Sequence, residues 1–426
     1  MTIIASVGAL ATLAACTTGS QSTGGKHTAA PTKSGASTTA AADHSSSAAD
    51  PAVITISGVG TRISPSTPVS VSIAHGKITA VKMTNSAKKA VTGAMAADGA
   101  SWRDTEDLGY GKTYDVAVTG KNDDGSSVVK NAQIKTVDPD NKVDVALDRT
   151  GDYPLSKGAT YGVAILPEFV FDEAISSSAD KLAAQKAITI TTTPHVAGAF
   201  AWNDDHHLYY RPQAYWPAGT KVSINAKMYG AHLGKGLYGQ QDKSTNFTVG
   251  RKQTTIADDN APQSVNTVKV YNAAGKVIKT MHTSMGEHGG TNANGQYINF
   301  YTLDGTYTVL THENPANMSS DSYGLPANAP GGYKSEKIYW STKISVDGIY
   351  LHELDSTVYA QEHGADVSHG CLNLSKSHAQ WYYKHSMVGD PVVINGKKAA
   401  PKIQVWQGGG WSVPWSAWQT GNITKY

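Results

Sequence analysis

The sequence has very little cysteine, with only Cys16 and Cys371 among 426 residues. Cys16 ends a short apolar leader, so Cys371 has no obvious disulfide partner in the rest of the chain. This excludes a disulfide-braced scaffold, and it excludes the Cys-x-x-Cys pairs that hold many zinc ions. In an exported protein, a lone thiol with histidines nearby is a candidate cysteine nucleophile.

Charge is also scarce, because only 16% of the residues are charged and the formal net charge is +2. No block rich in lysine or arginine occurs, which argues against nucleic acid as a partner. Polarity comes largely from Ser, Thr, Asn and Gly, and together with 21 tyrosines this favours extended β-structure. The length predicts two to four domains.

Residues 3–15 form an apolar run that is too short to span a bilayer as a helix. The run ends in Leu13-Ala14-Ala15-Cys16, which resembles the bacterial lipobox, so we expect residues 1–16 to be a signal peptide with Cys16 lipidated. An exported protein anchored at the outer face of the cytoplasmic membrane or in the cell wall would follow. A plain cleaved signal with a coincidental cysteine is the alternative.

Residues 17–50 are almost all Ser, Thr, Ala and Gly, which predicts a flexible linker. Residues 51–150 and 151–250 then show short runs of period-two alternation separated by turn residues, such as Val69-Ser70-Val71-Ser72-Ile73. This pattern predicts two successive β-sandwich domains. A third domain, 251–400, carries further strands and one helical candidate over 377–387, with Ser375 as a possible cap.

Residues 401–426 contain four tryptophans among Gly and Pro, namely Trp406, Trp411, Trp415 and Trp418. They suggest either a strip that faces glycan or membrane, or rings packed back across the third domain. We expect the second arrangement, because four exposed indoles would form a large apolar patch.

The chemistry is concentrated in Ser368-His369-Gly370-Cys371-Leu372-Asn373. A free thiol has a pKa near ~8.5, so it needs a base or a neighbouring cation near neutral pH. His352 ends the apolar stretch 348–352, where a strand end would place its imidazole at the rim of a sheet. Gly370 allows a tight turn that can aim backbone amides at an oxyanion.

Each of these residues also has a simpler interpretation. A lone cysteine such as Cys371 is commonly a small buried hydrophobe, and His369 is best explained as a local hydrogen-bonding strut. His352, His363 and His369 with Cys371 do not match the spacing of the usual zinc sites, so we expect no metal. His206-His207 lies in a predicted strand of the second sandwich and is interpreted as surface decoration.

His352 followed by the motif 368–373 resembles the signature of the L,D-transpeptidases, whose catalytic domain is of the YkuD type. Residues 318–326 and 330–333 resemble the substrate lid of the actinobacterial members, which carry two immunoglobulin-like domains before the catalytic domain. The resemblance implies a mainly β protein, in which two immunoglobulin-like sandwiches precede a β-sandwich catalytic domain with one or two short helices.

The resemblance also assigns roles to residues. Cys371 would be the nucleophile and His352 its base, oriented by the backbone carbonyl of Glu353, whose own carboxylate we expect to raise the pKa of the histidine. The amides of His369, Gly370 and Cys371 would form the oxyanion hole. The residues implied to line the substrate pocket are Met318, Tyr323, Tyr333, Asp347, Gly348, Ser368 and Asn373.

The implied reaction needs no cofactor and joins two peptidoglycan stem peptides. Cys371 attacks a tetrapeptide donor stem, D-alanine leaves, and the side-chain amine of an acceptor stem resolves the thioester to a 3→3 cross-link. Carbapenems would acylate the same cysteine. Two alternatives stay open, which are an L,D-carboxypeptidase or other cysteine hydrolase of the stems, and a non-catalytic wall-binding lipoprotein.

Overall fold

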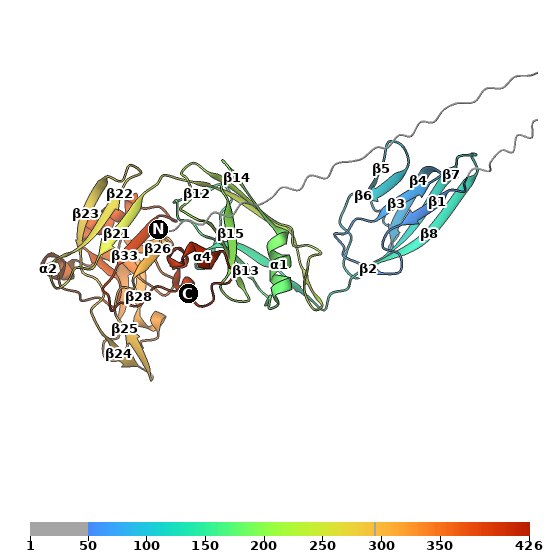
Figure 1. Cartoon of the computed structure of the whole chain (residues 1–426). Coiled ribbons are helices and arrows are strands. Elements are labelled where there is room, and N and C mark those ends of the chain that lie inside the picture. Colours follow the sequence, from blue (N-terminus) through green and yellow to red (C-terminus); the bar gives the residue numbers. More distant parts are fainter. Residues whose placement is uncertain (1–49, 294) are drawn as a thin grey trace, which may run out of the picture. The chain divides into compact units, whose positions relative to one another are not determined.

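The computed structural model describes residues 50–426 except residue 294, so the predicted signal peptide, Cys16 and nearly all of the linker lie outside the described residues. The described part is built mainly from strands, which confirms the predicted fold class (Figure 1). No helix in the described part is long and apolar enough to cross a membrane.

The first block forms two four-stranded sheets that enclose one apolar core between Ile54 and Ile134. One sheet has the order β1 (Val53–Ile56), β3 (Ser70–Ala74), β6 (Ser101–Asp104), β5 (Gly93–Met95). The other has the order β2 (Arg62–Ile63), β8 (Ser127–Thr136), β7 (Thr113–Asn122), β4 (Gly76–Asn85). The alternation read from the sequence is visible in β3, where Val71 and Ile73 are buried and the residues between them are exposed.

The second block has its own core, which runs from Val143 to Val249. Its larger sheet has the order β11 (Tyr153–Pro154), β10 (Val145–Arg149), β13 (Pro167–Phe171), β16 (His207–Pro212), β15 (Gly198–Trp202). The facing sheet has the order β12 (Ala159–Tyr161), β20 (Lys243–Val249), β17 (Lys221–Ala226), β14 (Ile188–Thr193). A small sheet joins β18 (His232–Gly234), β19 (Leu237–Gly239) and β9 (Asn141–Val143), and one helix, α1 (Ser178–Ala187), follows β13.

Strands β9 and β10 precede the predicted boundary at residue 150, yet they pair with strands that follow it. The strand pairing of the first sandwich therefore ends with β8, at Thr136. The domain boundaries at 150 and 250 stay predictions.

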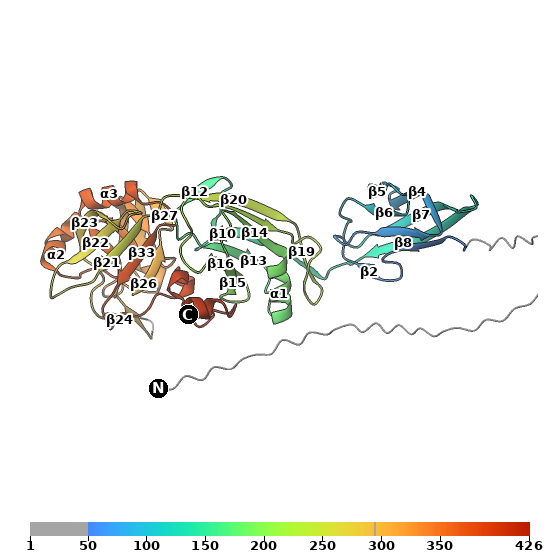
Figure 2. The ribbon, with the colours of Figure 1, turned by 45° about the horizontal axis from the view of Figure 1, so that its top comes forward.

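The third block contains a five-stranded sheet whose strands lie side by side in Figure 2. Its order is β23 (Val277–Thr283), β22 (Asn266–Tyr271), β21 (Thr254–Asp258), β33 (Pro391–Asn395), β26 (Gly305–Thr308). A four-stranded sheet has the order β27 (Thr311–Glu313), β30 (Ser341–Lys343), β31 (Tyr350–Glu353), β32 (Leu372–Leu374). Two hairpins pair β24 (Gly290–Ala293) with β25 (Gln296–Asn299), and β28 (Ala316–Ser319) with β29 (Lys334–Ile338).

Short helices complete this block: η1 (Ser320–Tyr323), η2 (Asp355–Thr357), α2 (Val358–His363) and α3 (Lys376–His385). The predicted helix 377–387 corresponds to α3, and Ser375 is its N-cap residue by position, although its side chain makes no capping hydrogen bond. Helix α2 lies between β31 and β32, in the segment that joins His352 to Cys371.

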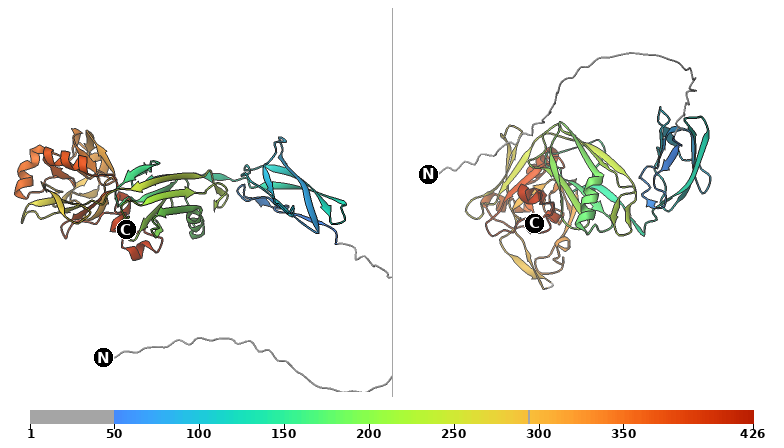
Figure 3. Two further views of the ribbon diagram at one scale, coloured as in Figure 1. Left: turned by 90° about the horizontal axis from the view of Figure 1, so that it is seen from above. Right: turned by 45° about the vertical axis from the view of Figure 1, so that its right-hand side comes forward.

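The C-terminal segment, with η3 (Val405–Gln407), η4 (Gly410–Ser412) and α4 (Trp415–Trp418), lies against the second sandwich (Figure 3). The indole nitrogens of Trp411 and Trp418 donate to the carbonyls of Ala164 and Ala199. The buried guanidinium of Arg211 sits over three indole rings, at 4.4 to 5.4 Å from their centres, and donates to Val413.

The tail also contacts the catalytic domain, where the Thr306 amide donates to the Ser412 hydroxyl at 2.7 Å and the Val346 amide donates to the Gln407 carbonyl at 2.9 Å. It therefore packs on the second sandwich in addition to the surface that the sequence predicted. Trp411, Trp415 and Trp418 gather around a cation that belongs to the second sandwich, while Trp406 is 55% exposed. The reason is the attraction of Arg211 for aromatic faces once both are removed from water.

Candidate active site

Cys371 lies immediately before β32, which pairs in parallel with β31 in a register that sets His352 opposite Asn373. Successive side chains of a strand point to opposite faces. Leu351, Leu372 and Leu374 accordingly enter the core of the third block. Cys371 and His352 lie on the other face, where both line one cavity. Cys371 is 8% exposed, and it borders a second cavity as well, so it is reachable from two sides.

His352 is held by its own strand end. Its Nδ1 lies 3.0 Å from the backbone carbonyl of Glu353, the contact that the resemblance implies. A carbonyl oxygen can only accept, so Nδ1 carries the proton and Nε2 presents a lone pair. Burial lowers the pKa of His352, and the hydrogen bond to the Glu353 carbonyl opposes this shift without overcoming it. The expectation that the Glu353 carboxylate raises this pKa is wrong, because desolvation of the ring dominates.

The thiol of Cys371 is also held neutral. Its S–H donates to the carbonyl of Gly348 with a sulfur-to-oxygen distance of 3.6 Å. Burial raises the pKa of the Cys371 thiol to about 11, and the charge of Asp347 adds to this, while a backbone hydrogen bond from Tyr350 acts in the opposite direction. Near neutral pH the resting pair is therefore a thiol and an uncharged imidazole.

Ser368 fixes the turn that carries the cysteine. Its hydroxyl accepts from the Gly370 amide at 3.1 Å and donates to the Cys371 carbonyl at 2.6 Å. The Thr302 hydroxyl donates to the Gly370 carbonyl at 2.9 Å. Gly370 has φ +128°, a conformation that side chains rarely allow, which explains the glycine here.

The same contacts bear on the implied oxyanion hole. Of its three amides, that of Gly370 is bonded to Ser368 in this structure. The amides of His369 and Cys371 have no hydrogen-bond partner within the described residues and remain available to an oxyanion.

The pocket residues implied by the resemblance divide between the two cavities beside Cys371. The first, of about 230 Å³, is lined in part by Met318, Tyr333, Ser368 and Asn373. The second, of about 430 Å³, is lined in part by Tyr323, Tyr333, Asp347 and Gly348. Tyr333 and His369, whose rings are 5.1 Å apart, belong to both.

The segment that resembles a lid is the β28–β29 hairpin together with η1. Met318 of this hairpin packs with Cys371 and Tyr350, and Tyr333 covers the same cluster. The Ser320 hydroxyl accepts from the Tyr333 amide at 2.9 Å, which closes the two ends of the loop onto each other. The hairpin therefore forms one wall of the site.

Several lining residues were missed by the sequence analysis. In the second cavity these include Gln296 and Tyr297 of the β24–β25 hairpin, and Trp406 and Gln407 of the tail. Gln407 donates to the Asp347 carboxylate at 2.7 Å, which ties the tail to the active site. A tyrosine near a glycine and a tryptophan in the Gly- and Pro-rich tail were the only sequence signals for these positions.

The histidines considered for zinc do not converge. His363 ends α2 and stacks on Tyr359 with ring centres 4.0 Å apart, and its Nδ1 bonds the Tyr359 carbonyl. His369 packs edge-on against Phe300 and beside Tyr333. His206 and His207 belong to the second sandwich.

Comparison with known proteins agrees with this geometry. The sequence profile of the bacterial Ig domain matches residues 60–232, and that of the L,D-transpeptidase catalytic domain matches residues 263–394. L,D-transpeptidase 2 of Mycobacterium tuberculosis is 36% identical over 83% of this chain and 80% of its own length. L,D-transpeptidase 5 of the same species is 33% identical over 83% of this chain and 73% of its own length.

A solved L,D-transpeptidase in complex with imipenem is 26% identical and covers 58% of this chain and 98% of its own, with a TM-score of 0.45. The relationship rests on the sequence matches, of which L,D-transpeptidase 2 spans both the Ig-like and the catalytic parts. They confirm the resemblance seen in the motif. The chain therefore belongs to the L,D-transpeptidase family and is an acyltransferase that acts on peptidoglycan.

Proposed function

We propose that Cys371 is the nucleophile of this transpeptidase and that His352 is its general base. The supporting observation is the tautomer of His352, whose Nδ1–H is committed to the Glu353 carbonyl while Nε2 is left as an acceptor. Cys371 borders the same cavity, on the same face of the β31–β32 pair. A base and a nucleophile placed in this way need no third side chain to orient the ring.

In the first step, Sγ attacks the carbonyl carbon of the third residue of a tetrapeptide stem, and the thiol proton passes to Nε2 of His352. The amides of His369 and Cys371 stabilise the oxyanion. When the amide bond breaks, His352 returns the proton to the nitrogen of D-alanine, which leaves. The product is a thioester on Cys371 with His352 neutral again.

In the second step, the side-chain amine of a neighbouring stem attacks the thioester, and His352 accepts the proton that the nitrogen loses. Sγ leaves and recovers a proton from His352, so a 3→3 amide cross-link forms and the enzyme is regenerated. Two cavities that meet at Cys371 suit a reaction in which a donor and an acceptor approach one sulfur.

Transfer to an amine is tested by incubating the purified protein with disaccharide-tetrapeptides and separating the products by mass spectrometry. We expect a dimer whose fragmentation shows the 3→3 bond, together with free D-alanine. Trimmed monomers alone would instead identify an L,D-carboxypeptidase. Unchanged activity of Cys371→Ala would overturn the assignment of the nucleophile.

We further propose that carbapenems acylate Cys371, because the strained lactam carbonyl can take the place of the donor carbonyl beside the same sulfur. Intact-mass measurement after incubation with imipenem is expected to show a single adduct that Cys371→Ser abolishes. His363→Ala is the matched control, since His363 is an exposed histidine of the segment between His352 and Cys371. Equal labelling of Cys371→Ser would refute this site of attack.

For the N-terminus we propose lipidation at Cys16, which would hold the enzyme at the outer face of the cytoplasmic membrane or in the cell wall. The support is the sequence Leu13-Ala14-Ala15-Cys16 followed by a polar linker. Metabolic labelling with a fatty-acid analogue is expected to mark the wild type and not Cys16→Ala, which should be released into the medium. An unlabelled wild type found only in the medium would indicate a plain cleaved signal.

A further inference from the structure

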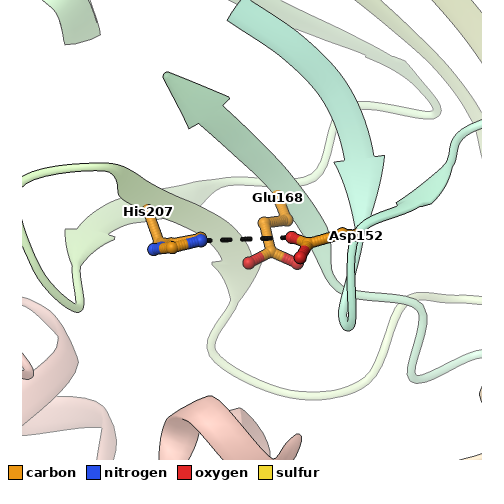
Figure 4. Close-up of side chains that lie close together, drawn as sticks. All are labelled: Asp152, Glu168 and His207. Atoms are coloured by element: carbon orange, nitrogen blue, oxygen red, sulfur yellow. Dashed lines mark ion pairs between the residues drawn. The ribbon is translucent and has the colours of Figure 1, made fainter. Parts of the chain in front are cut away.

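Three side chains of the second sandwich converge far from Cys371 in the sequence. Asp152 lies in the turn between β10 and β11, Glu168 is on β13, and His207 begins β16. Figure 4 shows the three side chains pointing toward one another, and one ligand atom from each lies within 4.8 Å of the others. One imidazole nitrogen with two carboxylate oxygens is a donor set that suits zinc.

His207 is oriented for such a role. Its Nδ1 lies 2.8 Å from Asp204 Oδ2 and 2.9 Å from Oδ1, and Asp204 also accepts from the backbone amides of His206 and His207. The carboxylate accepts a hydrogen bond from Nδ1–H, which directs Nε2 toward Asp152 and Glu168. Metal-binding histidines are typically held in this way, with the second ring nitrogen bonded to a carboxylate.

Glu168 supplies an independent observation. The residue is 2% exposed, and its Oε2 is buried without a hydrogen-bond partner. Tyr209, its cross-strand neighbour, hydrogen-bonds to the carboxylate, while burial raises the pKa of Glu168 to about 7. Burying a carboxylate oxygen with no partner is costly, and the cost is removed when the oxygen binds a cation.

The negative charge of the acidic side chains around His207 also favours a bound cation. Asp152, Glu168 and Asp204 surround a single imidazole. Burial raises the pKa of Glu168 to about 7, yet the group stays net negative even when both Glu168 and His207 carry a proton. In the described part of the chain, no lysine or arginine forms an ion pair with Asp152 or Glu168. The one ion pair found, between His207 Nε2 and Asp152 Oδ1, has a separation of 4.0 Å, which is too long for a hydrogen bond.

We propose that Asp152, Glu168 and His207 bind one zinc ion, with Asp204 as the residue that orients the imidazole. Zinc–nitrogen and zinc–oxygen bonds of about 2.1 Å place two ligand atoms of a tetrahedral ion roughly 3.4 Å apart. The ligand atoms lie within 4.8 Å of one another here, so they must draw together to complete the site. Asp152 is largely exposed to solvent, so a water molecule has access to the fourth position.

The proposed zinc site lies where the second sandwich meets the catalytic domain. The turn that carries Asp152 touches the catalytic domain, since a side chain at Gly151 would come within 3.3 Å of Val346. Val346 precedes Asp347 and Gly348, which line the second cavity beside Cys371. The ion would join three separate segments of the second sandwich at the place where that sandwich abuts the active-site loop.

A comparable cluster, Asp259, His288 and Asp366, does not carry the same inference. The ammonium of Lys397 lies 3.4 Å from Asp259, and Nε2 of His288 lies 3.3 Å from both carboxylates. Lys397 and the imidazole of His288 already lie beside the acids there.

The experiment uses the full chain carrying Cys371→Ser, which removes the thiol as a competing ligand. The protein is stripped with chelator and titrated with zinc sulfate by calorimetry, with bound zinc counted by elemental analysis. We expect one zinc per chain, and a rise in melting temperature with zinc that follows mass action. Glu168→Gln and His207→Ala should each abolish this binding, and Asp204→Asn should weaken it about 10- to 100-fold.

His206→Ala is the matched control, because it removes an adjacent imidazole whose Nδ1 faces the Phe171 carbonyl instead of the cluster, and it should bind zinc like the parent. If His207→Ala fails to fold, Asp152→Asn replaces an exposed side chain and should still lower the affinity. Binding that survives Glu168→Gln, or a parent that binds no zinc at pH 7.5, would overturn the proposal and leave an imidazolium held between carboxylates.

Discussion

Replacing His352 with alanine tests the proposed mechanism most directly, because the structure sets the size of the effect. With the thiol pKa at about 11, only about 3 × 10⁻⁴ of Cys371 is thiolate at pH 7.5. Without a base, attack depends on this fraction. We therefore expect His352→Ala to slow acylation by imipenem by about 10³-fold, which corresponds to about 4 kcal/mol in the activation free energy.

The pH dependence separates this mechanism from a resting thiolate–imidazolium pair. In the wild type the base must be neutral, and because burial lowers its pKa, the acid limb of the rate should fall below the usual histidine value of about 6.5. Above that pH the rate should be level. In His352→Ala the rate should instead rise about tenfold per pH unit toward pH 11, as the thiolate fraction rises.

The rate constant for adduct formation would be measured by rapid quench and intact mass between pH 5 and 9.5. His363→Ala should reproduce the wild-type profile, since its ring lies on α2 and stacks on Tyr359. The general-base role would be refuted if His352→Ala were acylated at a rate within tenfold of the wild type, or if its acylation rate did not depend on pH.

Three further substitutions probe the support of the site and of the tail. Ser368→Ala leaves the Gly370 amide without its acceptor at a cost of about 1–3 kcal/mol, and we expect slower acylation with wild-type folding by circular dichroism. Gly370→Ala places a side chain at φ +128° and should cost about 1–3 kcal/mol in urea unfolding as well as activity. Trp418→Ala removes a fully buried indole bonded to Ala199 and should lower the free energy of unfolding by about 3–5 kcal/mol, which urea titration would measure; no change would contradict the packing described.

Much of the candidate site could be predicted from the sequence, because its contacts are local or follow from strand alternation. The motif 368–373 keeps its backbone contacts within a few residues, as Ser368 bonds Gly370 and Cys371. The alternation of β31 and β32 sends leucines to the core and directs His352 and Cys371 to the cavity. Both patterns involve residues that are close together in the sequence, so they can be predicted without the tertiary structure.

What could not be predicted depends on contacts between distant segments. Trp406 and the β24–β25 hairpin reach the second cavity through the tertiary fold, and no local pattern connects them to Cys371. Arg211 is buried in the second sandwich, and no sequence pattern indicates this burial. A buried guanidinium is stabilised by aromatic rings and carbonyl groups, so three indole rings pack against it there.

The interpretation of His207 as surface decoration also missed contacts between distant segments. Its partners Asp152 and Glu168 come from a separate turn and a separate strand, and burial of the Glu168 carboxylate appears only once the sheet is assembled. The pKa of His352 likewise depends on burial in the folded chain, and the adjacent acid in the sequence suggested the opposite direction.

The neutral state of the proposed catalytic pair also bears on the choice between amine and water as acceptor. A thiol with a pKa of about 11 is a weak nucleophile until a donor carbonyl is seated beside it, so the charge appears only when the amides of His369 and Cys371 can share it. After D-alanine leaves, His352 is uncharged and can take a proton from the incoming nitrogen. The same burial that lowers its pKa would also disfavour the ammonium form of an acceptor amine in the cavity, which raises the fraction able to attack. Water gains no comparable activation from desolvation, so in this mechanism the burial of the pair favours cross-linking over hydrolysis.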